Sequence, residues 1–423
     1  MTASIETAAG GTESELIFDW NVAGPQAPPP PRHVELDDET LRDGLQSPSA
    51  RMPAIEQKIT LLHLIDSLGI ETADIGLPGA GPHVLADVKR LAREIADKHL
   101  KVAANCAART LRVDIDPIVE ASQFGGIPIE ACVFIGSSPI RQYAEDWTLD
   151  QMLGHTDDAV SYAVAEGLPV MYVTEDTTRA HPATLERLFT QAIESGATRI
   201  CLCDTVGHAT PEGAHNLVTW ARRLVHERDS AVKIDWHGHN DRGLGVVNAL
   251  AAAYAGADRL HGTAIGIGER VGNAAMDQIL VNLRLLDWID RDLSDLGAYC
   301  DLAAEMTGME LPASYPVMGA DAFRTGTGVH AAAIIKAMKK GDDWLANRVY
   351  SGVPAEYFGR RQLIELGPMS GQANVVFWLQ TRNLEVTQEL VDELFAACKT
   401  ADSVLLEADV LRIVAERQAS KAG

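Results

Sequence analysis

Residues 198–241, TRICLCDTVGHATPEGAHNLVTWARRLVHERDSAVKIDWHGHND, contain the pattern that decides the fold. Two short runs rich in strand-forming residues, Thr198–Cys203 and Val232–His237, flank a longer segment with helical periodicity, Pro211–His226. A strand, a helix and a second strand in this order predict two parallel strands, because parallel neighbours need a crossover connection. Polar side chains follow each run directly, at the ends where parallel strands place functional residues.

The same unit repeats along most of the chain. Eight such runs occur, namely His33–Asp37, Ile70–Gly76, Lys101–Cys106, Glu130–Ile135, Pro169–Thr174, Thr198–Cys203, Val232–His237 and Arg259–Ile265. The clearest helical segments between them are Pro53–Leu68, Leu149–Glu166, Thr184–Ser195, Pro211–His226 and Leu244–Ala255. Eight β/α units in about 260 residues match the size of a (β/α)8 TIM barrel. No run is followed by the GxGxxG turn of a doubly wound sheet, so we predict the α/β barrel.

The alternation of runs and helices divides the chain into three expected parts. Residues 1–31 are polar and acidic, end in four prolines and predict a disordered or arm-like tail. Residues 32–290 form the expected catalytic barrel, and residues 291–423 a mostly helical C-terminal appendage. Within the appendage, helical patterns cover residues 291–310, 328–340 and 386–416.

Composition excludes several classes of protein. The chain has 36 Lys and Arg against 59 Asp and Glu, a net charge of −23, which argues against a nucleic-acid partner. No window approaches the 18 apolar residues of a membrane span, and the first residues do not resemble a signal peptide. Six cysteines in 423 residues do not make a disulfide framework. A cytoplasmic protein without a membrane partner is therefore expected.

Two histidines indicate a metal site. His237 and His239 are two residues apart in a predicted strand, so their side chains project from the same face. Asp43 follows the first run and supplies a carboxylate, and Asn273 follows the eighth run. Two imidazoles and a carboxylate are ligands for a divalent cation, with positions left open for a chelating substrate. We expect Mg²⁺, Mn²⁺ or Zn²⁺, and the alternative is a hydrogen-bonded histidine pair without metal.

Other polar residues at the predicted strand ends suggest catalysis. Arg42 could stabilise an oxyanion or bind a carboxylate, and Glu175 could act as an acid or base. Thr205 offers a hydroxyl at the same rim of the barrel. Each residue also has a purely structural interpretation, an ion pair for Arg42 and Glu175 and a cap for Thr205.

Four motifs in this order resemble one protein family. They are Leu41–Gln46 (LRDGLQ), Asp204–Gly207 (DTVG), His237–Asp241 (HGHND) and Gly268–Asn273 (GERVGN). From about residue 33 to residue 380, the chain resembles the metal-dependent TIM-barrel family of 2-isopropylmalate, homocitrate and citramalate synthases. The resemblance implies an acyltransferase that condenses acetyl-CoA with a 2-oxoacid to give a 2-substituted malate and free CoA.

The resemblance also implies roles for individual residues. The three expected metal ligands match those of the family, and Asn273 matches a position beside the metal. Arg42 matches an arginine near the ketone oxygen, and Glu175 matches a catalytic glutamate. Thr205 matches a threonine that holds the oxoacid carboxylate, and Gln46 lies in the motif that contributes to the substrate pocket.

A motif in the appendage implies a homodimer. Gly326–His330 (GTGVH) is similar to a family segment whose histidine reaches an active site, commonly that of the partner subunit. His330 and Glu175 are therefore the candidates for the catalytic acid and base, and the sequence does not assign the two roles.

Two departures from the family bear on the substrate. The leucine-sensing domain of many isopropylmalate synthases is not expected here. Arg141 stands where isopropylmalate synthases tend to have histidine and homocitrate synthases an arginine. An arginine could pair with a second acidic group, so the alternative substrates are 2-oxoglutarate, oxaloacetate and phosphonopyruvate.

Two rival functions are disfavoured. Hydroxymethylglutaryl-CoA lyases share the RDG and HxH motifs, but they carry a cysteine in a loop after the eighth strand. The corresponding residues Gly266–Gly272 include no cysteine, which favours a synthase. A non-catalytic relic of the fold is disfavoured because every matched position has a chemically competent residue.

Overall fold

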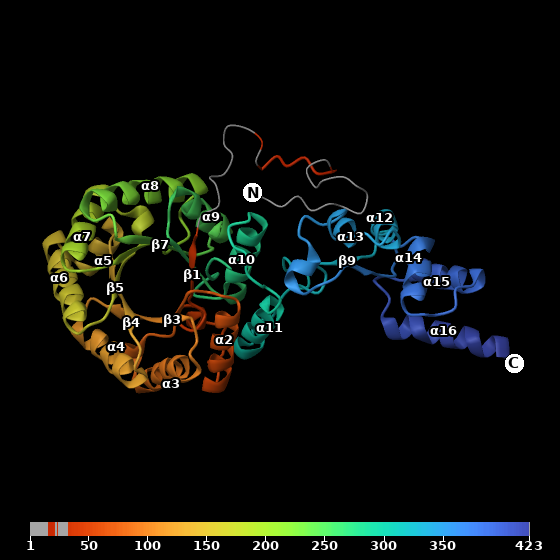
Figure 1. Ribbon diagram of the computed structural model, residues 1–423, viewed down its shortest axis with the longest axis horizontal. Helices are drawn as coiled ribbons and strands as arrows, with labels where there is room; N and C mark the ends of the chain where they lie inside the picture. The colour runs from red at the N-terminus through yellow and green to blue at the C-terminus, as the bar shows by residue number, and fades with distance from the viewer. Residues whose placement is uncertain (1–15, 22, 24–32, 423) are drawn as a thin grey trace. The chain divides into compact units, whose positions relative to one another are not determined.

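Eight parallel strands close into a barrel in the computed structural model, which describes residues 16–21, 23 and 33–422 (Figure 1). Each strand pairs with the next along the chain, and β8 pairs back to β1. The strands are β1 (Glu35–Asp38), β2 (Thr72–Asp74), β3 (Ala103–Arg109), β4 (Ile129–Gly136), β5 (Val170–Glu175), β6 (Arg199–Asp204), β7 (Lys233–Gly238) and β8 (Arg259–Gly262). The predicted TIM-barrel fold is confirmed.

Helices cover the outside of the barrel (Figure 1). They are α2 (Ile55–Ser67), α3 (Pro82–Lys98), α4 (Arg112–Gly125), α5 (Pro139–Glu145), α6 (Leu149–Ala165), α7 (Pro182–Glu194), α8 (Pro211–Arg228), α9 (Gly245–Ala255), α10 (Met276–Leu285) and α11 (Leu296–Thr307). In α3 the buried apolar residues Val88, Leu91, Ala92 and Ile95 recur at helical spacing, as a helix with one inward face requires. Among the described residues, no helix is long and apolar enough to cross a membrane.

Three strands are shorter than the runs that predict them, and the first of these, β1, begins at Glu35 rather than at His33. The run Ile70–Gly76 is a strand only over Thr72–Asp74, because the Asp74 carboxylate accepts a hydrogen bond from the backbone N–H of Gly76 and turns the chain. The eighth run ends as a strand at Gly262, and the chain then enters a 3₁₀ turn over Ala264–Gly266. At the carboxyl ends of β2 and β8 the chain thus leaves the sheet early at the rim of the barrel, and β2 also begins two residues later than its run, at Thr72.

The interior of the barrel contains ion pairs. Arg259 on β8 donates to Glu130 on β4 at 2.7 Å, although β8 pairs only with β7 and β1 in the sheet. The contact therefore crosses the interior of the barrel. The alternate residues Trp236 on β7 and Leu260 on β8 are buried in the opposite direction, against the helices. Side chains at alternate positions thus point into the interior, where the ion pairs lie beside an apolar cluster of Cys132, Met171, Cys201 and Cys203.

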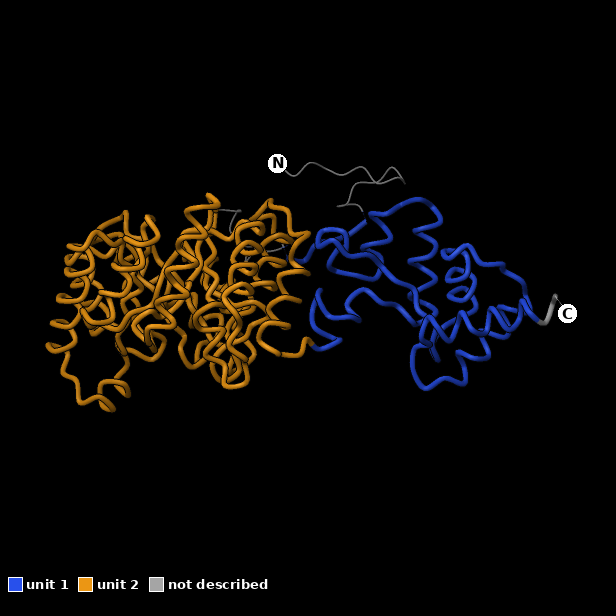
Figure 2. The backbone as a smooth tube through the Cα atoms, turned by 90° about the horizontal axis from the view of Figure 1, so that it is seen from below, with its two compact units in different colours: residues 1–27, 312–423 blue, residues 28–311 orange. Residues whose placement is uncertain are grey.

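The barrel unit ends at Leu311, and a second compact unit begins at Pro312 (Figure 2). Helix α11, which the sequence places in the appendage, belongs to the barrel unit, where Tyr299 donates a hydrogen bond to Asp38 at the end of β1. This unit therefore extends past the boundary expected at residue 290. Most of the expected tail, residues 1–31, lies outside the described residues.

The second unit is mostly helical. Its elements are β9 (Arg324–Thr325), α12 (Gly328–Lys339), α13 (Asp343–Arg348), β10 (Leu363–Ile364), α14 (Gln372–Thr381), α15 (Gln388–Thr400) and α16 (Glu407–Ala422). Strands β9 and β10 form a short parallel pair. Trp378, Leu379 and Leu394 are buried together in the core that joins the last three helices.

Candidate active site

A cavity of about 170 Å³ opens among the carboxyl ends of the barrel strands. Its polar and charged lining residues are Glu39, Arg42, Asp43, Gln46, Asp74, Glu175, Thr205, His237, His239, His261 and Glu269. The structure thus brings together the sequence-derived candidates of β1, β5, β6 and β7. Asn273 and Arg141 lie beside this group without lining the cavity, and His330 lies in the second unit.

Asp43 faces both histidines of the HxH motif. Its Oδ2 atom is 3.6 Å from His237 Nε2 and 3.5 Å from His239 Nε2, and all three side chains are buried or nearly so. These separations are longer than a good N–H···O hydrogen bond. They are close to the distance between neighbouring ligands of one cation, about 3.0–3.4 Å for ligand bonds near 2.1 Å.

The other ring nitrogen of each histidine already has an acceptor. His237 Nδ1 lies 3.1 Å from a carboxylate oxygen of Glu39, and His239 Nδ1 lies 3.2 Å from the carbonyl oxygen of Gly272. If both Nδ1 atoms carry the proton, both Nε2 atoms present a lone pair toward Asp43. Burial, together with the neighbouring His237, lowers the pKa of His239 to about 4, which keeps its ring neutral. Three acceptor atoms with no proton between them fit a divalent cation.

Local backbone geometry places these groups. Asp43 lies in a tight loop after β1, where the Glu39 carbonyl accepts hydrogen bonds from the N–H groups of Arg42 and Gly44, both at 3.1 Å. Gly272 has φ of 91°, and a Cβ there would lie 1.8 Å from the Gly266 carbonyl oxygen. Only glycine fits this position, from which its carbonyl reaches His239.

Asn273 adds a further acceptor next to the histidines. It forms an isolated bridge with His239, and its Nδ2 donates to the Ile267 carbonyl at 3.3 Å. Its Oδ1 atom is buried and has no hydrogen-bond partner among the described residues. A buried amide oxygen without a partner is destabilising unless a cation or a bound water satisfies it, which agrees with a place beside a metal.

Arg42 is held by carboxylates on several sides. Its Nε donates to Asp74 at 2.8 Å, a second nitrogen donates to Glu39, and a third lies 3.7 Å from Asp43. Burial, with Glu39 and Asp37, raises the pKa of Asp74 to about 7 although Arg42 opposes the shift. Arg42 is therefore both ion-paired and part of the cavity wall, where its guanidinium is fixed before any ligand binds.

Glu175 ends β5 and lines the cavity with its carboxylate partly exposed. Burial raises its pKa, although Arg141 lowers it in part. Arg141 on α5 lies 3.5 Å from Glu175 and 3.3 Å from Glu145, so its guanidinium points toward the rim of the cavity. Its Nε is buried without a hydrogen-bond partner among the described residues.

The two remaining barrel candidates lie at the wall and the mouth of the cavity. Thr205 Oγ1 accepts a hydrogen bond from the backbone N–H of Asp176 at 2.8 Å. This contact joins the ends of β5 and β6 and is not the cap that the sequence suggested, and the hydroxyl proton remains available for a ligand in the cavity. Gln46 is exposed at the cavity mouth.

His330 is an exposed residue of α12 in the second unit. Its ring stacks on Tyr350 with 4.2 Å between ring centroids. The pair forms an aromatic surface beside Val329, whose side chain is also exposed.

Four of the polar and charged lining residues named above were not among the sequence-derived candidates, namely Glu39, Asp74, His261 and Glu269. A signal for Glu39 and His261 was available. His261 lies two residues after the interior Arg259, and Glu39 lies two residues after Asp37, so each shares the inward face of its strand. Polar residues at inward positions of a barrel strand are candidates for a site.

Comparisons with known proteins extend these observations. The model of the family described as HMGL-like matches residues 33–303. Over 373 residues the chain is 33% identical to homocitrate synthase AksA of Methanopyrus kandleri, covering 87% of this chain and 88% of that protein. It is 30% identical over 374 residues to 2-isopropylmalate synthase of Shouchella clausii, covering 87% of this chain and 70% of that protein. The HMG-CoA lyase structure from Bacillus subtilis, at 24% identity and a TM-score of 0.56 over 67% of this chain and 97% of that chain, is similar in fold.

Proposed function

The chain belongs to the HMGL-like family, and from this premise we propose that it condenses acetyl-CoA with a 2-oxoacid to give a 2-substituted malate and free CoA. It is an acyltransferase of the homocitrate and 2-isopropylmalate synthase type, and it depends on a divalent metal. The observation that supports this best is the convergence of Asp43, His237 and His239 in the cavity that Arg42 and Glu175 also line.

Each residue in the cavity has a task in this reaction. A divalent cation held by Asp43 and the two histidines would polarise the ketone of the oxoacid. Arg42 donates hydrogen bonds to the ketone oxygen as it becomes negative, and its ion pairs orient it beforehand. Thr205 donates a hydrogen bond from its hydroxyl to the oxoacid carboxylate, and Gln46 contacts the substrate at the mouth of the cavity.

We assign the proton transfer from the acetyl methyl group to Glu175. Its carboxylate lines the cavity, and burial raises its pKa, which makes it a stronger base. The resulting enolate carbon attacks the ketone carbon, and hydrolysis of the thioester releases CoA. His330 supplies the complementary acid in this assignment.

Two further proposals concern the identity of the bound metal and the compartment of the cell in which the reaction takes place. One carboxylate and two imidazoles, with an amide oxygen nearby, fit Mg²⁺, Mn²⁺ or Zn²⁺, and we propose one of these three cations. We place the reaction in the cytoplasm.

Free thiol released from acetyl-CoA with a panel of 2-oxoacids tests the function. The panel contains 2-oxoisovalerate, pyruvate, 2-oxoglutarate, oxaloacetate and phosphonopyruvate, each with Mg²⁺ or Mn²⁺. We expect an oxoacid with a second acidic group to have the highest kcat/KM, because Arg141 reaches the rim beside Glu175.

Arg141→His should then lower kcat/KM for that acid by about 10- to 100-fold, with the loss mainly in KM, and shift the preference toward 2-oxoisovalerate.

Two results would contradict parts of this proposal. A clear preference of the unchanged protein for 2-oxoisovalerate would show that Arg141 does not select the substrate. If no oxoacid releases CoA with either metal, the synthase function is wrong, and cleavage of hydroxymethylglutaryl-CoA is the reaction to test next.

We propose further that the active protein is a homodimer in which His330 serves the site of the partner subunit. The motif Gly326–His330 and the exposure of His330 beside Tyr350 support this.

Two variants, Glu175→Gln and His330→Ala, should each be nearly inactive alone. After subunit exchange of an equal mixture, half of the dimers are mixed and each has one intact site, so about a quarter of wild-type activity should return.

Recovery of activity depends on both defects falling in the same site of the mixed dimer, which leaves the other site intact. If His330 serves its own subunit, every site of the mixture has one defect, and activity stays at the level of the single variants. A mass measurement that finds monomers would also contradict the dimer.

A further inference from the structure

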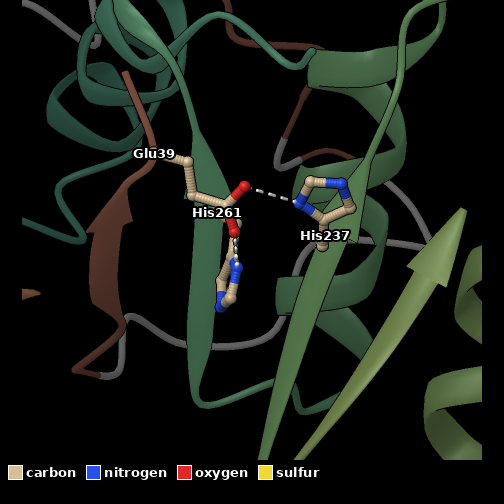
Figure 3. A group of neighbouring side chains, drawn as sticks. All are labelled: Glu39, His237 and His261. Carbon is tan, nitrogen blue, oxygen red and sulfur yellow. Dashed lines mark hydrogen bonds and ion pairs between the residues drawn. The ribbon is translucent and has the colours of Figure 1, made fainter. Parts of the chain in front are cut away.

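Glu39 joins two histidines of the cavity (Figure 3). One carboxylate oxygen accepts from His237 Nδ1 at 3.1 Å, and the other accepts from His261 Nδ1 at 2.6 Å. Arg42 donates to the same carboxylate. Glu39 is 3% exposed, so these contacts are made in an environment with little water.

We propose that Glu39 is a positioning residue that fixes His237 as a metal ligand, and that His261 in turn fixes Glu39. The inference rests on the metal site proposed above. A carboxylate that accepts from Nδ1 sets the tautomer of an imidazole, orients its ring and makes Nε2 a stronger donor toward a cation. Glu39 has this relation to His237, whose Nε2 faces Asp43.

His261 is held between carboxylates on both sides. Its Nδ1 contacts Glu39, and its Nε2 lies 3.2 Å from Asp235. Asp235 itself accepts a hydrogen bond from Arg259 Nε at 2.6 Å. The contacts from Glu39 through His261 to Asp235 therefore end at an ion pair in the barrel interior. Two carboxylate partners require a proton on each ring nitrogen, so His261 donates in both directions. Burial alone would lower its pKa, but the nearby carboxylates of Asp37, Asp235 and Glu39 raise it well above the usual value.

The geometry does not favour a second cation at this place. Glu39, His237 and His261 are close enough together to suggest a ligand group. His261, however, has both nitrogens engaged with carboxylates, and the guanidinium of Arg42 already neutralises Glu39. A cation would have to displace a proton and compete with the guanidinium.

The two metal-ligand histidines differ in their support. His239 Nδ1 contacts the neutral carbonyl of Gly272, whereas His237 Nδ1 contacts the carboxylate of Glu39. Removal of the negative charge at Glu39 should therefore weaken the metal site through His237. This difference identifies Glu39 as the residue to change.

Direct Mn²⁺ binding to the full-length protein without substrates tests the inference. Glu39→Gln should raise the Mn²⁺ Kd by about 10- to 100-fold, measured by titration calorimetry and by Mn²⁺ electron paramagnetic resonance. A glutamine can offer its carbonyl oxygen to only one of the two histidine N–H groups, and its NH₂ group then faces the other. The variant has nearly the same shape, and circular dichroism with a thermal melt reports its folding.

A matched control residue, elsewhere in the barrel unit, is a buried glutamate that contacts one histidine and one arginine. Glu94 on α3 is buried and accepts from His63 at 3.0 Å and from Arg90 at 3.4 Å. Glu94→Gln thus removes a buried glutamate charge beside a histidine and an arginine without touching the cavity. Its Mn²⁺ Kd should stay within about twofold of the wild-type value.

Three outcomes decide the inference. A Glu39→Gln protein that is folded and binds Mn²⁺ within twofold of wild type would overturn it, and so would two Mn²⁺ ions bound per wild-type chain at this site. If Glu39→Gln does not fold, His261→Gln is the second variant, and an unchanged Kd there overturns the inference equally. Because binding is measured without substrates, failure of the wild type to release CoA would contradict the proposed function and leave this comparison intact.

Discussion

Asp43→Asn is expected to lower kcat for CoA release by about 10³-fold or more and to abolish tight Mn²⁺ binding. Asp43 is the one anionic member of the ligand group that it forms with His237 and His239. An amide in its place is neutral and presents NH₂ or a weaker oxygen donor to the cation. A loss of about 4 kcal/mol of electrostatic stabilisation in the transition state corresponds to this factor.

The measurement combines kcat in the thiol-release assay with Mn²⁺ titration of the same preparation. Asp114→Asn is the matched control, because Asp114 is also buried beside an arginine, Arg109, but does not line the cavity. The control should bind Mn²⁺ normally and keep its activity. An Asp43→Asn protein with more than a tenth of the wild-type kcat would contradict the proposed ligand set.

Glu175→Gln is expected to lower kcat by about 10²- to 10⁴-fold, the range for loss of a general base. The pH profile should change with it. Burial raises the pKa of Glu175, and Asp176 and Glu145 act in the same direction, whereas Arg141 and Arg42 lower it. The deprotonated form is the base, so wild-type kcat/KM should fall as the pH falls through this raised pKa. The variant should lose that acid limb.

Glu145→Gln separates the role of the base from the ion pair with Arg141. Glu145 lies 3.3 Å from Arg141, much as Glu175 does at 3.5 Å, but it does not line the cavity. We expect less than a threefold change in kcat for this control. A Glu175→Gln protein that loses less than tenfold in kcat, with the acid limb unchanged, would assign the base to another residue.

The periodic runs of the sequence predicted the barrel because each strand is specified locally. Gly69, Gly167, Gly196 and Gly256 each follow a helix, and their φ values of 69°, 82°, 106° and 115° lie in the left-handed region that glycine adopts most readily, so a local sequence feature marks where these helices end. Helix α11 was harder to place. Its sequence indicates a helix, but its contact with Asp38 at the end of β1, which puts it in the barrel unit, depends on a residue far away in the chain.

In the candidate site, too, local sequence predicts some features, and others depend on residues far apart in the chain. His237 and His239 are two residues apart, so the strand period alone places them on one face, and Asp43 follows another strand end. Thr205 shows the limit of such reasoning, because only the structure reveals that its hydroxyl accepts from the backbone N–H of Asp176 and that the residue lines the cavity. Likewise, only the contact with Glu175 in the structure shows that the Arg141 side chain points toward the rim of the cavity.

The sequence by itself determined the parallel barrel, the rim where its chemistry lies and the residue types that could bind a cation. Periodicity and strand ends are local properties, so a single chain reveals them. Only the tertiary structure decided that Glu39 supports His237 and that His261 holds Glu39. Glu39 and His261 are 222 residues apart and meet because β8 closes onto β1, and no local pattern specifies which side chains such a closure brings within hydrogen-bond distance.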